Sequence, residues 1–133
     1  MQMITTGHAE TRSTSIAAPP SAVLDVVGDP LRLPDWAPNF AQAVRPDGDG
    51  WLIDNGTSEF RIAVRVSREH GTVDLLAPTG PPAGAFMRVV HNGQGSELLF
   101  TLFFPHGTDK AAITTQMATV EDELETVRTL CEA

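Results

Sequence analysis

Residues 113–131 read ITTQMATVEDELETVRTLC. The apolar side chains of this stretch recur at alternating steps of four and three residues, which places them along one face of a helix. They are Ile113, Met117, Val120, Leu124, Val127 and Cys131. The acidic residues, predicted to lie away from this stripe, are Glu121, Asp122, Glu123 and Glu125. A helix of roughly 23 residues, capped at Thr108 or Asp109, would span about 35 Å and needs an apolar surface to cover its stripe.

Short runs of alternating apolar and polar residues supply that surface. The clearest run covers residues 57–68, where Phe60, Ile62, Val64 and Val66 share one face. Its other face carries Glu59, Arg61 and Arg65. Such alternation is typical of a strand with one buried and one solvated face. Further strands are predicted at residues 40–46, 51–55, 72–77, 85–91 and 96–104, because Gly, Asn and Asp residues that suit tight hairpin turns separate them.

The part of the chain before residue 40 has a different pattern. Residues 12–18 are rich in β-branched and small side chains and predict a first strand, which Pro19 and Pro20 end. Two short helices are expected at residues 21–27 and 31–36. The whole pattern predicts an α+β fold in which a seven-stranded antiparallel sheet wraps around the long C-terminal helix. The two short helices lie between the first and second strands.

Composition limits the function classes. The chain has 133 residues, and we expect one domain over residues 11–133, with residues 1–10 as a leader or an extension of the first strand. Its net charge of −8 argues against nucleic acid and anionic membrane surfaces as partners. The single cysteine, Cys131, excludes an internal disulfide, and no apolar run is long enough for an integral membrane segment. We therefore expect a cytoplasmic protein.

Turns in a meander of strands alternate between its two ends. By this rule Asn55-Gly56, the long connection at residues 78–84 and the exit at residues 105–107 share one end of the sheet. A pocket between sheet and helix is predicted to open there, near Trp36.

Two segments carry a resemblance to a known family. Residues 13–23, STSIAAPPSAV, and residues 28–38, GDPLRLPDWAP, resemble the opening of the helix-grip superfamily, which is also called SRPBCC. Residues 100–105, FTLFFP, are similar to its last strand and the exit into the final helix. This superfamily includes START lipid-transfer domains, pollen-allergen-like proteins and polyketide cyclases. The resemblance covers nearly the whole chain from Thr11 onward.

The resemblance implies a function without choosing among the family's chemistries. It implies an apolar cavity between sheet and C-terminal helix that binds a polyketide, a lipid, a sterol or an aromatic compound. The alternative is a polyketide cyclase or dehydratase that uses the same cavity, and a third hypothesis is an interaction module, such as a homodimer. No cofactor or metal is expected, because the histidines are dispersed and the Cys-x-His pattern of iron–sulfur relatives is absent.

The candidate ligand-binding residues are bulky and are expected to point inward. They are Trp36, Phe60, Met87, His91, Phe100, Phe104 and Met117. Each apolar member could equally be ordinary core. His91 is the candidate acid or base, because alternation directs it inward beside apolar neighbours. Its alternative is a histidine satisfied by backbone or water at a hairpin end.

Overall fold

The computed structural model describes residues 3–78 and 84–133. The N-terminal elements are β1 (His8–Ile16), α1 (Pro20–Val27), the 3-10 turn η1 (Pro30–Arg32) and α2 (Leu33–Trp36). Six strands follow: β2 (Ala43–Asp47), β3 (Gly50–Asp54), β4 (Glu59–Ser67), β5 (Thr72–Leu76), β6 (Gly84–Asn92) and β7 (Gly95–Phe104). The long helix α3 (Lys110–Glu132) completes the fold.

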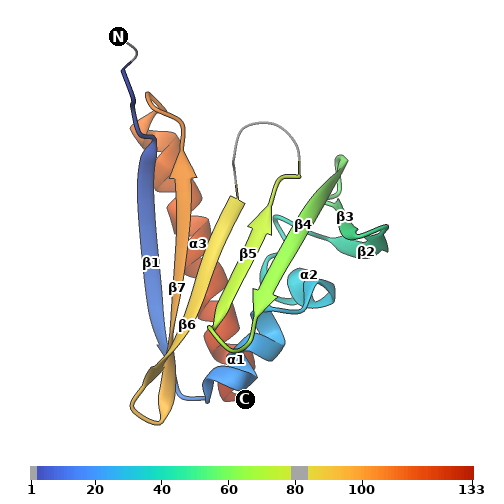
Figure 1. The fold of residues 1–133 in the computed structure, drawn as a ribbon, viewed down its shortest axis with the longest axis vertical. Coiled ribbons are helices and arrows are strands. Elements are labelled where there is room, and N and C mark those ends of the chain that lie inside the picture. The colour runs from blue at the N-terminus through green and yellow to red at the C-terminus, as the bar shows by residue number, and fades with distance from the viewer. Residues whose placement is uncertain (1–2, 79–83) are drawn as a thin grey trace.

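Within the described residues, seven strands form one antiparallel sheet in the order β1-β7-β6-β5-β4-β3-β2. Figure 1 shows the sheet in front, α3 running behind it from top to bottom, and α1 and α2 beside the lower half of α3. The first strand forms one edge of the sheet by pairing with the last, so that His8 lies opposite Phe104 and Ile16 opposite Ser96. The predicted α+β architecture is confirmed.

The largest difference in strand boundaries concerns β1, which covers His8–Ile16 rather than residues 12–18. At Ala17 the chain has already left the sheet, because its backbone N–H donates to the Glu132 carboxylate of α3 at 2.8 Å. At the other end, His8 to Glu10 continue the pairing with β7. These residues of the segment predicted as leader or strand extension are therefore part of β1.

Residues at the beginning of the two helical segments favour their formation. Pro20 occupies the first turn of α1, where a missing N–H costs no hydrogen bond. The Asp29 side chain accepts a hydrogen bond from Leu31 N at 3.1 Å and so begins the turn that leads into α2. This turn places Trp36, at the end of α2, under the sheet with 2% of its surface exposed.

Helix α3 covers the sheet with the predicted stripe. Its buried members are Met117, Val120, Leu124 and Val127, while Ile113 and Cys131 are partly buried. Asp109 occupies the cap position of α3, but its side chain makes no capping hydrogen bond. Across residues 3–78 and 84–133, no helix combines the length and apolar character that a membrane crossing requires.

One apolar residue that was predicted to be buried is exposed. Val66 belongs by alternation to the buried face of β4, yet 41% of its surface is exposed. It lies near the end of β4, beside Gly28, where the chain leaves α1. The cover of the sheet ends there, so alternation no longer implies burial.

Candidate functional site

Two of the cavities in the described part of the chain lie against different flanks of α3. The first, called the apolar pocket here, has a volume of about 300 Å³ and lies between α2, α3 and strands β4 to β7. Its main apolar lining residues are Leu33, Trp36, Phe40, Phe60, Ile62 and Phe100. The volume is at the lower end of the range for small-molecule sites in proteins.

The apolar pocket follows from the alternation of the strands. Phe60 and Ile62 in β4 and Phe100 in β7 lie on the face that α3 covers. Phe40 packs its ring edge against Phe60, with 5.5 Å between ring centres. These rings form an aromatic part of the pocket wall.

Trp36 brings a polar group into this apolar setting. Its indole Nε1 is buried and finds no hydrogen-bond acceptor within the part of the chain that the structure describes. A buried donor without a partner costs about 1–3 kcal/mol. The nitrogen is closed off from the pocket as well as from solvent, so Trp36 lines the pocket with the apolar part of its ring.

Glu123 also lines the apolar pocket. Burial raises the pKa of its carboxyl to about 7, and the neighbouring charge of Asp122 adds to the rise. Glu123 makes no ion pair with any residue in the described ranges. Much of the carboxyl is therefore protonated at neutral pH.

The sequence-based placement of Glu123 away from the apolar stripe was wrong. Glu123 directly precedes the buried Leu124 and follows Val120 by three residues, so it borders the stripe. Gln116, which lies seven residues earlier on the same flank of α3, lines the pocket as well. A polar pair spaced by seven along one border of the stripe is the sequence signal for this site.

Arg61 is the other charged residue among the described lining residues of the apolar pocket. Its guanidinium is engaged by the β2–β3 hairpin, donating to Asp49 Oδ1 at 2.6 Å and to the Asp47 carbonyl oxygen at 2.8 Å. It is therefore not directed to Glu123 as an ion-pair partner.

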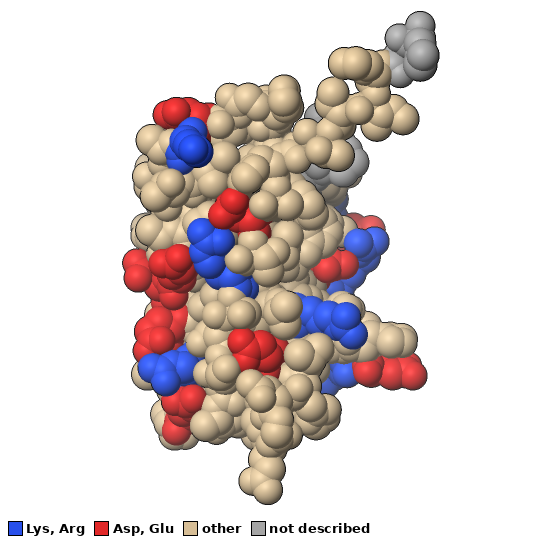
Figure 2. Space-filling view, turned by 90° about the vertical axis from the view of Figure 1, so that its left-hand side faces the viewer, with Lys and Arg blue, Asp and Glu red and all other residues tan. Residues whose placement is uncertain are grey.

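The second cavity, called the polar groove here, lies between β1, α3 and the loop that joins β7 to α3. Its volume is about 640 Å³. Figure 2 faces this side of the molecule and shows basic side chains among acidic ones, with many acidic side chains at the edge where α3 lies.

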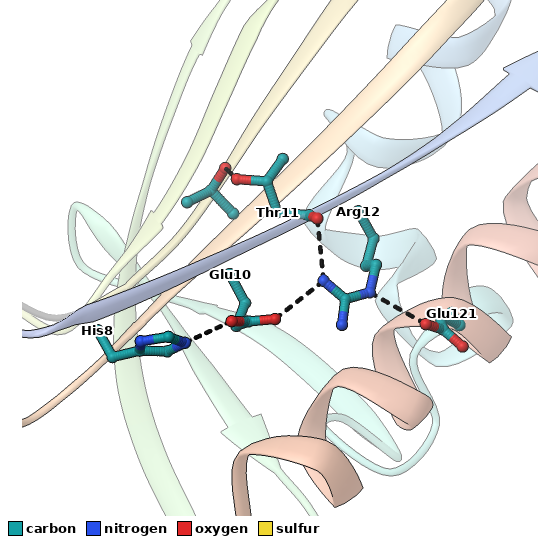
Figure 3. Close-up of polar contacts among 6 residues, drawn as sticks. His8, Glu10, Thr11, Arg12 and Glu121 are labelled. Carbon is teal, nitrogen blue, oxygen red and sulfur yellow. Dashed lines mark hydrogen bonds and ion pairs between the residues drawn. The ribbon is translucent and has the colours of Figure 1, made fainter. Parts of the chain in front are cut away.

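A chain of polar contacts crosses the polar groove (Figure 3). His8 contacts Glu10, and Arg12 donates to Glu10 at 3.1 Å and to Glu121 at 3.0 Å. Hydrogen bonds from His8 and then Arg12 lower the pKa of the Glu10 carboxyl. The same two carboxylates raise the pKa of Arg12, Glu121 more than Glu10. Arg12 thus links the carboxylates of Glu10 and Glu121 across the groove.

The structure brings together three of the seven predicted ligand-binding residues. Trp36, Phe60 and Phe100 line the apolar pocket, whereas Met117 lines the polar groove. Met87 is buried in the core, and Phe104 is partly buried against it. Met87 and Phe104 line neither the apolar pocket nor the polar groove.

His91 does not have the predicted inward position. Its side chain is exposed near the end of β6, and it lines neither cavity. The β6–β7 hairpin lies at the bottom of Figure 1, where it reaches beyond the helices that cover the sheet. The predicted opening lies at the opposite end, and residues 79–83 of that prediction fall outside the described residues.

No group of three or more metal-ligating side chains occurs within the two described ranges. The polar and charged side chains among the described lining residues of the apolar pocket include Glu123, Gln116 and the engaged Arg61.

Comparison with known proteins supports the fold. No family model matches the sequence, and no curated protein matches it significantly. Solved structures do match, at low sequence identity. One is a START superfamily protein from Mycobacterium smegmatis, which is 16% identical over 95% of this chain and 98% of that chain, with a TM-score of 0.70.

Two further structures have the same fold. The Aha1 dimer from Colwellia psychrerythraea is 12% identical over 94% of this chain and 96% of that chain, with a TM-score of 0.73. DynU16, a protein in the dynemicin biosynthetic locus, is 18% identical over 91% of this chain but 46% of that chain, with a TM-score of 0.64. The chain therefore has a START-like helix-grip fold, as the sequence resemblance implied.

Proposed function

We propose that this protein binds a small, mostly apolar molecule in the apolar pocket. The observation that carries the proposal is a cavity of about 300 Å³ with an aromatic and aliphatic wall and few polar groups. Small-molecule sites typically combine such a wall with a few polar groups that orient the guest. Polyketides, sterols, lipids and aromatic compounds have this character.

The polar groove is a weaker candidate for the same role. It is larger, but its carboxylates and guanidinium already bind one another. A guest would have to replace those contacts, which offsets the gain from new ones.

Filling the apolar pocket tests the proposal. Ala85 in β6 lines it, and Ala85→Phe places a ring in the space that a ligand would occupy. Ala118→Phe adds the same ring to α3 on the side of the polar groove and is the matched control. Each protein is mixed with a panel containing a fatty acid, a sterol and tricyclic aromatics, and complexes are counted by native mass spectrometry.

We expect a one-to-one complex with at least one panel member for the unchanged protein and for Ala118→Phe. For Ala85→Phe we expect loss of that complex, with unchanged circular dichroism as the check of folding. If the unchanged protein binds no panel member, or if Ala85→Phe binds as well as the control, the proposal is wrong.

A second candidate function is proton-transfer catalysis in the same pocket, as in a cyclase or dehydratase. Glu123 supports it better than His91, because its carboxyl lines the pocket and has a pKa of about 7. The test is Glu123→Gln with a polyketide-type substrate. The enzymatic proposal expects turnover to vanish while affinity is retained, and it fails if turnover is unchanged.

A further inference from the structure

The first strand of the sheet has one open edge. Strand β1 pairs with β7 on one side, and no strand within residues 3–78 and 84–133 pairs with its other side. Figure 1 shows β1 at the left-hand edge of the sheet with α3 behind it, and Figure 2 faces this edge. An open strand edge presents backbone N–H and C=O groups that can pair with another strand. The edge of β1 is therefore a surface on which a strand can dock.

The pairing of β6 establishes which backbone groups face which neighbour. Alternate residues of an antiparallel strand direct their N–H and C=O groups to opposite sides. The Val89 N–H of β6 donates to the Gly71 carbonyl oxygen, next to β5, at 2.8 Å. Val90 is then directed to the other side, where it pairs with Glu97 of β7. The odd-numbered residues of β7 therefore bond to β6, and its even-numbered residues bond to β1.

The same alternation identifies the free backbone groups of β1. Leu98 of β7 is directed toward its partner Thr14, so the even-numbered residues of β1 bond to β7. The odd-numbered residues direct their N–H and C=O groups to the open edge. The Thr11 carbonyl oxygen accordingly accepts a hydrogen bond from the side chain of Arg12 at 3.1 Å. The residues that face the open edge are Ala9, Thr11, Ser13 and Ser15.

Two opposite charges lie on either side of Thr11 (Figure 3). Glu10 and Arg12 both point toward the α3 side of β1, where Arg12 donates to Glu121 at 3.0 Å and to Glu10 at 3.1 Å. Thr11 points to the other face of the sheet, and its hydroxyl is 2.7 Å from the hydroxyl of Thr101. The edge thus carries an acid and a base placed symmetrically about one residue.

We propose that the open edge of β1 pairs antiparallel with the same edge of a second copy of this chain, with Thr11 on the two-fold axis. Each Thr11 then exchanges both backbone hydrogen bonds with Thr11 of the second copy. Each Glu10 lies opposite Arg12 of the second copy, on the α3 side of the joined sheet. A two-fold interface uses the same patch on both copies, and this patch complements itself.

The charges select this register over its neighbours. An axis at Glu10 would place two glutamates opposite each other, and an axis at Arg12 would place two arginines opposite each other. Like charges directly opposite in a sheet are destabilising, whereas opposite charges stabilise it. With the axis at Thr11, the Glu10 and Arg12 pairs fall at positions without backbone hydrogen bonds, where side chains approach more closely. An axis at Ala9 or Ser13 would shorten the overlap of the two strands.

The interface consists mainly of two strand edges, so it is small, and small interfaces belong to weak and transient complexes. We expect a dissociation constant on the order of 100 µM. Sedimentation velocity from about 10 µM to about 1 mM covers this range. The unchanged protein should change from monomer to dimer over the series.

Exchanging the two charges tests the register. Glu10→Arg and Arg12→Glu each place like charges opposite each other, and each should weaken the dimer at least about tenfold. The double variant carries both substitutions and restores opposite charges across the axis, so it should regain most of the lost affinity. Circular dichroism checks that all three variants are folded.

Thr11 provides a matched pair of variants. Thr11→Pro removes the backbone N–H on the axis but no hydrogen bond to β7, because Thr11 is directed to the open edge. Thr11→Val also removes the hydroxyl but keeps the N–H. We expect Thr11→Pro to remain monomeric and Thr11→Val to dimerise as the unchanged protein does.

Amide hydrogen exchange, measured by NMR, locates the interface. Protection of the Thr11 and Ser13 N–H groups should rise with protein concentration, since these groups are free in the monomer. The Arg12 and Thr14 N–H groups bond to β7, so their protection should not depend on concentration.

Every outcome decides the inference. A protein that stays monomeric up to about 1 mM overturns it. A dimer without added protection at Thr11 and Ser13, or one that the charge exchange does not restore, uses another surface and also overturns it. Strand β1 contributes no residue to the described lining of the apolar pocket, so these measurements do not bear on the binding proposal.

Discussion

Glu121 and Glu123 lie two residues apart on α3 and have opposite surroundings. Glu121 is exposed at the polar groove and accepts a hydrogen bond from Arg12 at 3.0 Å. Glu123 faces the apolar pocket without an ion-pair partner in the described residues, and its pKa is raised to about 7. The flank of the helix therefore decides whether a carboxyl is a solvated charge or a weak acid near neutrality.

The two cavities differ in the same way. The polar groove is larger, yet Arg12 of β1 already binds Glu10 and, across the groove, Glu121 of α3. The apolar pocket is smaller, and Trp36 in its wall has a buried indole N–H without a partner in the described residues. The two cavities therefore differ in their polar contacts as well as in their size.

The largest effect on stability should come from replacing Met117, which is 1% exposed and lines the polar groove. Met117→Ala removes a buried side chain from the sheet–helix contact, so we expect a loss of about 2–4 kcal/mol in the free energy of unfolding. Urea denaturation measures it. Gln116→Ala, an exposed neighbour on the other flank, is the control and should change stability little. A loss no greater than that of the control would mean that α3 does not depend on this stripe.

Replacing Glu123 should have a smaller effect on stability, and this effect should depend on pH. Its folded pKa of about 7 exceeds the ordinary value of 4.5, so the folded state holds the proton more tightly between these values. Stability should therefore fall as pH rises from about 4.5 to 7, and Glu123→Gln should remove this fall. Because the carboxyl is partly exposed, we expect the variant to be more stable by only about 1–2 kcal/mol at pH 8, and nearly equal to the unchanged protein at pH 4.

Thermal unfolding at the two pH values checks this prediction. Glu121→Gln, on the opposite flank of α3, is the matched control and should not remove the fall in stability. A Glu123→Gln protein with the same pH dependence as the unchanged chain would show that Glu123 is ionised at neutral pH in the folded state.

The smallest effect on stability should come from replacing Arg12. Arg12→Gln removes its pairs with Glu10 and Glu121, which are partly open to solvent. Exposed ion pairs contribute little, and 1 M salt reduces the screening length to about 3 Å. We expect a small decrease in Tm at low salt that disappears in 1 M NaCl. A large decrease that persists in salt would indicate that the guanidinium contributes through packing.

The architecture could be predicted because two patterns in the sequence were long and agreed. The stripe from Ile113 to Cys131 has the period of a helix, and the run at Phe60, Ile62 and Val64 has that of a strand. Turn residues between the runs then fixed a meander. Neither pattern depends on distant contacts, so the sequence alone was sufficient.

The site could be predicted only in part, because periodicity reports the direction of a side chain and not what covers it. Phe60 and Phe100 were found by period, but His91 and Val66 lie where the cover of the sheet ends. Glu123 was missed for the opposite reason, since a charged residue at the border of the stripe becomes buried only when α2 and β4 lie opposite it. The burial of Glu123 therefore depends on tertiary contacts, which the pattern of the sequence does not show.

The pairing of β1 with β7 has a consequence for how the chain reaches its native state. His8 lies opposite Phe104 and Ile16 opposite Ser96, so these contacts join segments that are far apart in the chain. Bringing such distant segments together is slow, because a long loop must close before any contact is gained. During synthesis the first strand must wait, unpaired, for almost the entire remainder of the domain to emerge from the ribosome. The many serines and threonines of β1 keep that waiting edge polar, which limits its tendency to aggregate.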